Sequence, residues 1–227
     1  LGTMAAVAFF TTGNKLVQML MTVLGAVTSS IIPRMAYLVG KGDEKEAIAL
    51  QKKTLNLLLY VSIPMVFGII ALAHPLILLF GGKEFLPAVP VMQILSTLLV
   101  IITLSGFLGN QILIPMHKEK YGNYCVGGGA IANLTVNFIL IPLFAEIGVA
   151  IAVVIAETVV TAMHFYFAHR YMKLKWMDFV PVKCILASIL MFLVIVATYS
   201  NDFSPLYCFL WAIIGMIVYV VSLLGLK

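Results

Sequence analysis

The sequence predicts an all-α, polytopic transmembrane helix bundle with about seven spanning helices, and two observations lead to this prediction. Of the 227 residues, 63% are hydrophobic and only 10% are charged, whereas soluble domains average about 45–50% apolar and about 25% charged residues. The apolar residues also form continuous runs of about 20 residues or more, as spanning helices require. Strands of a transmembrane β-barrel would instead alternate in segments of about ten residues. The short connections leave no room for a soluble catalytic domain.

Charged residues, prolines and glycines separate the apolar runs. The first run is longer than one crossing needs and ends at Pro33-Arg34, and the second begins with an amphipathic lead-in that Asp43 is expected to cap. In order, the expected spans cover residues 4–38, 56–80 (with the lead-in at 44–56), 87–116, 121–144, 148–172, 179–199 and 205–226.

Basic residues alternate between the two sides of these spans. The connections on one side hold twelve Lys and Arg residues, and those on the other side hold Lys83 alone. By the positive-inside rule, the N-terminus lies outside and the C-terminus in the cytoplasm. Because no signal peptide is visible, we expect an odd number of further spans upstream, so that the chain is part of a longer protein. The twelve residues are Arg34, Lys41, Lys45, Lys52, Lys53, Lys118, Lys120, Arg170, Lys173, Lys175, Lys183 and Lys227.

The net charge and the cysteines exclude several other classes. The net charge of +5 and the isoelectric point of about 9.1 are explained by the topology signal, so nucleic-acid binding is not expected. The three cysteines have no CxxC spacing, so neither a disulfide framework nor a metal site is indicated. No cofactor is expected.

The first span carries a polar stripe, because its polar and small residues recur every three or four positions on one helical face. We expect this stripe to line a hydrated substrate cavity, in which Lys15 would meet an anionic group. Two alternatives remain: the stripe is a buried seam against another helix, or Lys15 extends to the outer interface. The stripe consists of Thr11, Asn14, Lys15, Gln18, Thr22, Gly25 and Ser29.

Glu157 is the acidic residue expected deep in the fifth span, and His164 lies on the same helical face. A carboxylate with an imidazole on its face could accept and pass a proton, so both are candidates for ion coupling. The alternatives are a structural hydrogen bond to a neighbouring helix and an ion pair with Lys15.

Other polar and small residues are expected at helix interfaces. Gly129, Asn133 and Asn137 share one face of the fourth span, and Gly148 and Ala152 begin a small-residue face on the fifth. Small residues and amides commonly form contacts between membrane helices. Asn110 and Gln111 in the third span are secondary cavity candidates.

Six segments between about residues 5 and 172 carry a family resemblance: Gly13-Asn14-Lys15 through Pro33-Arg34, Leu79-Phe80-Gly81 through Pro87-Ala88, Ile112 through Pro115, Asn133 with Asn137, Ile141-Pro142, and Gly148 through Glu157. In their order they resemble the Wzx/RfbX-type oligosaccharide flippases of the multidrug/oligosaccharidyl-lipid/polysaccharide exporter superfamily. The chain departs from the usual pattern of this family at Ala145, where glycine is common, and at Val149, where alanine is common.

The resemblance implies a two-lobed exporter fold in the cytoplasmic (inner) membrane of bacteria. Residues 1–175 would form the five-helix C-terminal lobe, residues 176–227 two additional helices, and a missing upstream segment the N-terminal lobe. The implied activity is transport rather than enzymatic: undecaprenyl-diphosphate-linked oligosaccharide would cross by alternating access for O-antigen or other surface polysaccharide synthesis. Membrane lipids and other glycan-assembly proteins are the further expected partners.

The alternatives are an exporter of drugs or of peptidoglycan lipid precursors from the same superfamily, a membrane-embedded polysaccharide polymerase, and a scaffold that transports nothing. The short outer connections disfavour the polymerase, because its reaction takes place outside the membrane and needs several polar residues there.

Overall fold

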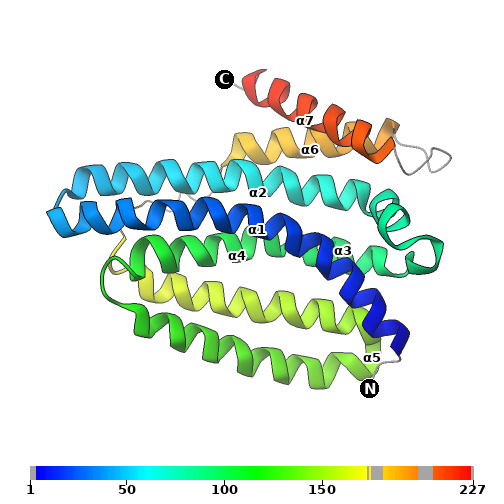
Figure 1. Cartoon of the computed structure of the whole chain (residues 1–227), viewed down its shortest axis with the longest axis horizontal. Coiled ribbons are helices and arrows are strands. Elements are labelled where there is room, and N and C mark those ends of the chain that lie inside the picture. Colours follow the sequence, from blue (N-terminus) through cyan, green and yellow to red (C-terminus); the bar gives the residue numbers. More distant parts are fainter. Residues whose placement is uncertain (1–3, 173, 175–180, 199–206, 226–227) are drawn as a thin grey trace.

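The computed structural model describes residues 4–172, 174, 181–198 and 207–225, and this part of the chain is helical, without strands (Figure 1). The all-α fold class is therefore confirmed. The elements are α1 (Met4–Lys41), α2 (Glu44–Gly81), the 3-10 helix η1 (Lys83–Phe85), α3 (Ala88–Ser96), α4 (Leu98–Leu108), the π-helical segment η2 (Gly109–Leu113), α5 (Glu119–Ala168), α6 (Val182–Thr198) and α7 (Tyr207–Gly225).

Five of the described segments are long and apolar enough to cross a membrane: α1, α2, the continuous stretch Ala88–Leu113, α5 and α7. The remaining apolar helix, α6, has 17 residues. The expected third span is interrupted, because α3, α4 and η2 follow one another within it. The count of seven crossings stays a prediction.

Helix α5 consists of two helical arms that meet at Ala145. This residue has φ 46° and ψ −121°, values outside the helical region, and Figure 1 shows the second arm returning beside the first. The turn falls in the expected connection between the fourth and fifth apolar runs. Gly148 is required just beyond it, because a Cβ atom there would lie 2.4 Å from the carbonyl oxygen of Leu140.

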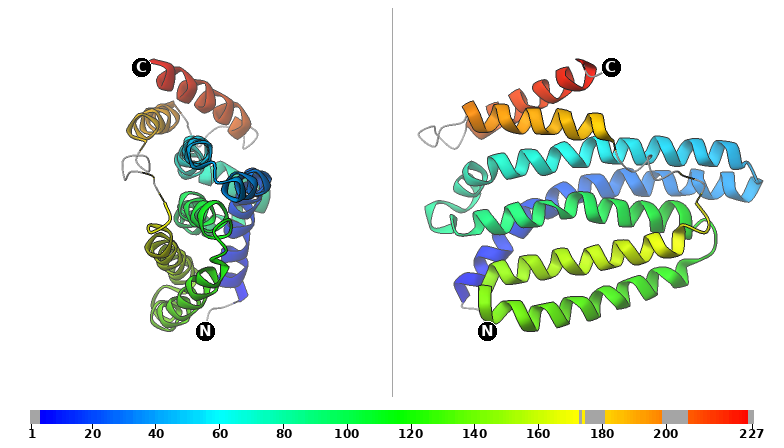
Figure 2. Two further views of the ribbon diagram at one scale, coloured as in Figure 1. Left: turned by 90° about the vertical axis from the view of Figure 1, so that its left-hand side faces the viewer. Right: turned by 180° about the vertical axis from the view of Figure 1, so that it is seen from behind.

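The helices stack side by side, with α6 and α7 on the outer side of α2 and the arms of α5 on the opposite side of the bundle (Figures 1 and 2). One apolar core joins α2 to α4, η2, α6 and α7. A second core joins α1 to α2, α3, α4 and the second arm of α5. These packed layers hold α1, α4 and α5 in fixed positions relative to one another.

A hydrogen bond from α7 compensates for a proline in α2. Pro64 has no backbone N–H, so the carbonyl of Tyr60 lacks its usual helical donor four residues later. The hydroxyl of Tyr219 donates to this carbonyl at 2.8 Å. The same hydroxyl lies 3.3 Å from the Sγ atom of Cys184 in α6, so the contact links three helices.

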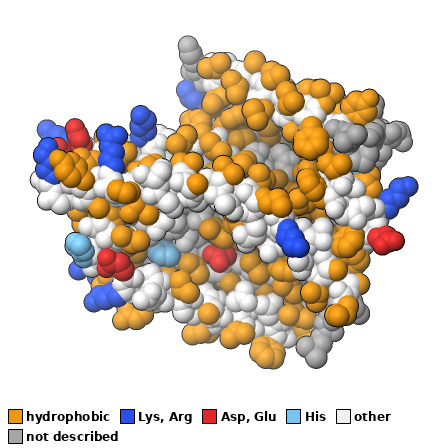
Figure 3. All heavy atoms as spheres, viewed as in Figure 1, with side chains coloured by type: hydrophobic (Ala, Val, Ile, Leu, Met, Phe, Trp, Pro, Cys, Tyr) orange, Lys and Arg blue, Asp and Glu red, His pale blue; other side chains and the backbone are white. Residues whose placement is uncertain are grey.

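The connections rich in Lys and Arg lie together at one end of the bundle. The chain passes from α1 to α2 there, and it also leaves η2 and α5 there (Figure 1). Figure 3 shows most Lys and Arg side chains at this end. Asp43 caps α2 as expected, accepting a hydrogen bond from the backbone N–H of Glu46 at 3.2 Å. Lys173, Lys175 and Lys227, which contribute to the topology prediction, lie outside the described residues.

Candidate functional site: an exposed polar stripe and a polar cavity

The polar stripe of α1 faces away from the rest of the chain. Lys15, Gln18 and Thr22 are exposed, as are Thr11, Gly25 and Ser29, while Asn14 is partly buried. Val17 and Leu24, on the opposite face, are buried in the core. The stripe is therefore not a buried seam against another helix of the described chain.

The hydroxyl groups of the stripe form hydrogen bonds within α1, but the longer side chains of Lys15 and Gln18 do not. The hydroxyl of Thr22 donates to the carbonyl of Gln18 at 3.0 Å, and that of Thr11 to the carbonyl of Val7 at 2.7 Å. Such bonds to the preceding turn let Thr and Ser tolerate an apolar environment. The ammonium group of Lys15 and the side-chain amide of Gln18 have no partner among the described residues. These two groups require water, another protein segment or a ligand.

A cavity of about 710 Å³ lies between α4, the start of η2 and both arms of α5. It brings together residues that are far apart in the sequence, and several are the predicted candidates. Its polar lining consists of Ser105, Asn110, Asn133, Glu157 and His164, and Gly129 also lines it. Such a mixture of a carboxylate, an imidazole, amides and a hydroxyl can bind water and pass protons between groups.

Glu157 is partly buried in this cavity, and its carboxylate has no hydrogen-bond partner among the described residues. His164 is buried, and its Nδ1 atom lies 2.9 Å from the hydroxyl oxygen of Ser105. The two side chains are seven residues apart, about 10 Å along the helix axis. They share the cavity without being close enough for a direct hydrogen bond.

Ser105 is a site residue that the sequence did not indicate. It lies 59 positions before His164 and is brought to it by the packing of α4 on α5. The π-helical segment η2 begins at the same place: a Cβ atom on Gly109 would lie 3.5 Å from the Nε2 atom of His164. Single π-helical turns within α-helices often occur at functional sites, and this one could have been suspected only from the neighbouring glycines.

A second, smaller cavity of about 200 Å³ lies between α1 and α4. It is lined by Gly25, Thr28 and Ser29 from α1 and by Asn110 from η2. Asn110 therefore borders both cavities and lies between the stripe of α1 and Glu157. Gln111 lies apart from both: it is fully buried, and its side-chain amide has no hydrogen-bond partner among the described residues.

Gly129 lies where the two arms of α5 pack closely against each other. A Cβ atom on Gly129 would lie 2.2 Å from the Cγ2 atom of Val160, and Ala152 is fully buried. Asn137 donates from Nδ2 to the Oδ1 atom of Asn133 at 2.6 Å, a bond within one arm rather than between helices. Asn133, which was expected at a helix interface, lines the cavity.

Two further expectations concern charge pairs and metals. Lys15 and Glu157, which are both described, do not form an ion pair, and Lys15 does not line the cavity of Glu157. No group of three or more His, Cys, Asp or Glu side chains that could hold a metal ion occurs in the described part of the chain.

Comparison with known proteins gives consistent results. A sequence model of the family described as "Polysaccharide biosynthesis protein" matches residues 2–90. The chain is 22% identical, over 96% of its length, to a probable low-salt glycan biosynthesis flippase of Haloferax volcanii, and covers 46% of that protein. It is 29% identical, over 73% of its length, to a putative O-antigen transporter of Escherichia coli, and covers 40% of it.

The fold is that of a solved flippase structure. The chain superimposes with a TM-score of 0.82 on a lipid II flippase MurJ in an inward closed conformation, with 18% sequence identity over 96% of this chain and 46% of that one. The chain thus spans less than half the length of each of these proteins, whose names describe flippases and a transporter rather than enzymes. The chain is thus similar to a polysaccharide biosynthesis family, to a glycan biosynthesis flippase and to an O-antigen transporter, and it has the fold of one half of a lipid II flippase.

Proposed function

We propose that the protein containing this chain moves undecaprenyl-diphosphate-linked oligosaccharides across the cytoplasmic membrane by alternating access, for the synthesis of O-antigen or another surface polysaccharide. Residues 1–175 form its C-terminal lobe, residues 176–227 add two helices, and an upstream N-terminal lobe completes the pathway. The N-terminus of the chain lies outside and its C-terminus in the cytoplasm. The relatives' names and the share of their length that the chain spans support this proposal.

The observation that carries the proposal is the exposed polar face of α1. This helix is the least hydrophobic of the five candidate spans, yet its polar stripe is uncovered. A charged side chain in the middle of a bilayer costs about 2.5–3.5 kcal/mol on insertion scales. The stripe is therefore better placed against a hydrated cavity between two lobes than against lipid.

In this cavity, Lys15 binds the diphosphate or an acidic sugar, and Asn14, Gln18 and Thr22 bind hydroxyl groups along the route. Asn110 extends the polar surface from this stripe to the second cavity. Glu157, with His164 in the same cavity, binds the coupling ion, and this ion is bound or released as the lobes rearrange. Other glycan-assembly proteins supply the substrate and receive it.

The decisive experiment replaces Lys15 by alanine in the full-length protein and measures export of surface glycan. A hydrogen-bonded charge is worth about 1.5–3 kcal/mol, so we expect transport to fall roughly tenfold to a hundredfold. Lys15→Arg should restore much of it, and Lys41→Ala, at the exposed basic end, is the matched control. Wild-type export by the Lys15→Ala variant would refute the assignment of this residue.

A second candidate function is export of a peptidoglycan lipid precursor, favoured by the likeness to the lipid II flippase. Both substrates carry a diphosphate on a polyprenyl chain, so Lys15 would serve either. A deletion strain distinguishes them by the lipid-linked intermediate that accumulates on the cytoplasmic side: an oligosaccharide precursor supports the first function, and lipid II supports the second.

A further inference from the structure

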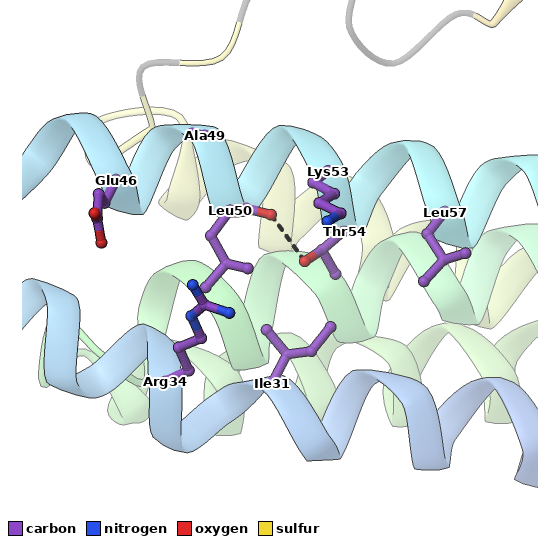
Figure 4. Close-up of a pocket in the computed structure, with 8 residues that line it drawn as sticks. All are labelled: Ile31, Arg34, Glu46, Ala49, Leu50, Lys53, Thr54 and Leu57. Carbon is purple, nitrogen blue, oxygen red and sulfur yellow. Dashed lines mark hydrogen bonds between the residues drawn. The ribbon is translucent and has the colours of Figure 1, made fainter.

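A groove of about 440 Å³ lies between α1 and α2, near the end of the bundle where the basic connections gather. Arg34 of α1 and Lys53 of α2 point into it from opposite walls, and Glu46 lies at one end (Figure 4). This groove is separate from the cavity of Glu157 and from the polar stripe, with which it shares no lining residue.

The two cations have no counterion among the described residues. Arg34 and Lys53 are both exposed, and neither forms an ion pair or a hydrogen bond with a described residue. Glu46 lines the same groove but lies farther than 4.0 Å from either cation, the limit for an ion pair. Thr54 does not offer its hydroxyl proton, because it donates to the carbonyl of Leu50 at 2.8 Å. The groove therefore presents two free positive charges to an anion.

The lining changes from charged to apolar along the groove. Because α1 and α2 run in opposite directions, Ile31 lies one turn deeper in the bundle than Arg34, and Leu57 one turn deeper than Lys53. On the other side, Glu46 lies two turns closer to the basic end than Lys53. Along the groove, Arg34 lies nearer the basic end, Lys53 lies opposite Ile31, and Leu57 lies deeper (Figure 4). A charged part that adjoins an apolar part in this way matches a phosphate attached to a hydrocarbon chain.

The depth of the groove fits the same ligand. With 38 residues, α1 is about 57 Å long, which exceeds the hydrocarbon core of about 30 Å. Arg34 lies seven residues, about 10 Å, before the end of α1 at Lys41. At this distance from the helix end, a cation reaches the phosphate layer of the bilayer.

We propose that the groove between Arg34 and Lys53 binds the phosphate group of a single membrane lipid, with the start of its hydrocarbon chain against Ile31 and Leu57. Arg34 donates two parallel hydrogen bonds to phosphate oxygens, as a planar guanidinium does, and Lys53 neutralises the remaining charge. The lipid is either an anionic phospholipid or a polyprenyl diphosphate. The site does not depend on the transport proposal, because both lipids carry the chemistry that it recognises.

The test compares lipid binding by two double variants of the purified full-length protein. Arg34→Gln with Lys53→Gln removes both cations of the groove. Lys41→Gln with Lys45→Gln removes the same charge from exposed positions that do not line it. Binding of phosphatidylglycerol and of undecaprenyl diphosphate is measured separately by native mass spectrometry, with thermal unfolding as the check that both variants are folded.

We expect the groove variant to lose at least about tenfold in affinity for one of the two lipids, and the control less than about threefold. The lipid that is lost identifies the source of the phosphate. A charge-preserving variant, Arg34→Lys with Lys53→Arg, should keep binding within a few-fold, and inorganic phosphate should not compete because it lacks the chain. Equal losses in the groove and control variants, or none in either, would overturn the proposal. If the Gln variant does not fold, the two single Gln substitutions give the same comparison.

Discussion

The hydroxyl of Tyr219 is predicted to stabilise the bundle because it supplies a hydrogen bond that Pro64 removes. Tyr219→Phe deletes the donor to the Tyr60 carbonyl, a bond of 2.8 Å, and leaves the aromatic ring in place. Tyr219 is 8% exposed, so water does not readily replace the lost donor. Leaving a buried acceptor without a partner costs about 1–3 kcal/mol, and we expect a loss of this size in the free energy of unfolding.

Pro64→Ala makes the prediction specific, because alanine restores a backbone N–H four residues after Tyr60. In that background the carbonyl has a helical donor, and Tyr219→Phe should cost about 0.5 kcal/mol or less. The two substitutions are therefore expected to be coupled by about 1 kcal/mol or more. Tyr37→Phe is the control, because Tyr37 is 67% exposed and its change should stay within about 0.5 kcal/mol.

All four members of the double-mutant cycle are purified in mixed detergent micelles. Their reversible unfolding is monitored by circular dichroism. Additive effects of Tyr219→Phe and Pro64→Ala would contradict the reasoning, since the hydroxyl would then stabilise the protein through something other than the carbonyl freed by the proline. A cost equal to that of Tyr37→Phe would refute it outright.

Three other substitutions test the turn, the close contact and the cavity. Ala145→Gly should raise the free energy of unfolding by up to about 1 kcal/mol, because the relief of a positive φ outweighs the added freedom of the unfolded chain; destabilisation in the same assay would argue against a strained turn. Gly129→Leu should lower it by about 1–3 kcal/mol or more, whereas Gly127→Leu, with open space at its Cβ position, should have little effect. Glu157→Gln should flatten the pH dependence of glycan transport in membrane vesicles, and an unaltered pH profile and rate would remove this residue from the coupling mechanism.

The fold class and most element limits could be predicted from the sequence because each depends on local composition. Continuous apolar runs determine the spans, and the charged or turn-forming residues between them determine the ends, as at Asp43. The break in the third run could not be predicted, since residues 88–113 are almost uniformly apolar and the change to a π-helical turn depends on packing against α5. The departure from the family pattern at Ala145 did mark the turn, because its positive φ is the conformation in which glycine is preferred.

Helical periodicity predicted which residues of the candidate site share a helix face, but not which residues of different helices meet. Glu157 and His164 share a face two turns apart, so the sequence places both in one cavity, but it contains no signal that Ser105 would lie beside His164. Asn110 and Gln111 show the opposite case. Neighbouring residues on a helix point about 100° apart, so one lines both cavities while the other is fully buried.

The two charges that the sequence places deep in the spans have different surroundings in the chain. Lys15 is exposed on the outer face of α1, whereas Glu157 is partly buried between the arms of α5. An ion pair between Lys15 and Glu157 would have neutralised both charges and given both a purely structural role. The fold instead keeps the two side chains apart, and Asn110 lies between their surroundings. Each charge then costs about 2.5–3.5 kcal/mol if it faces lipid, which is large beside the 5–15 kcal/mol that typically stabilises a folded protein. A bundle that retains both must place them against water or polar partners, and the pathway that we propose between two lobes would provide this environment for both charges at once.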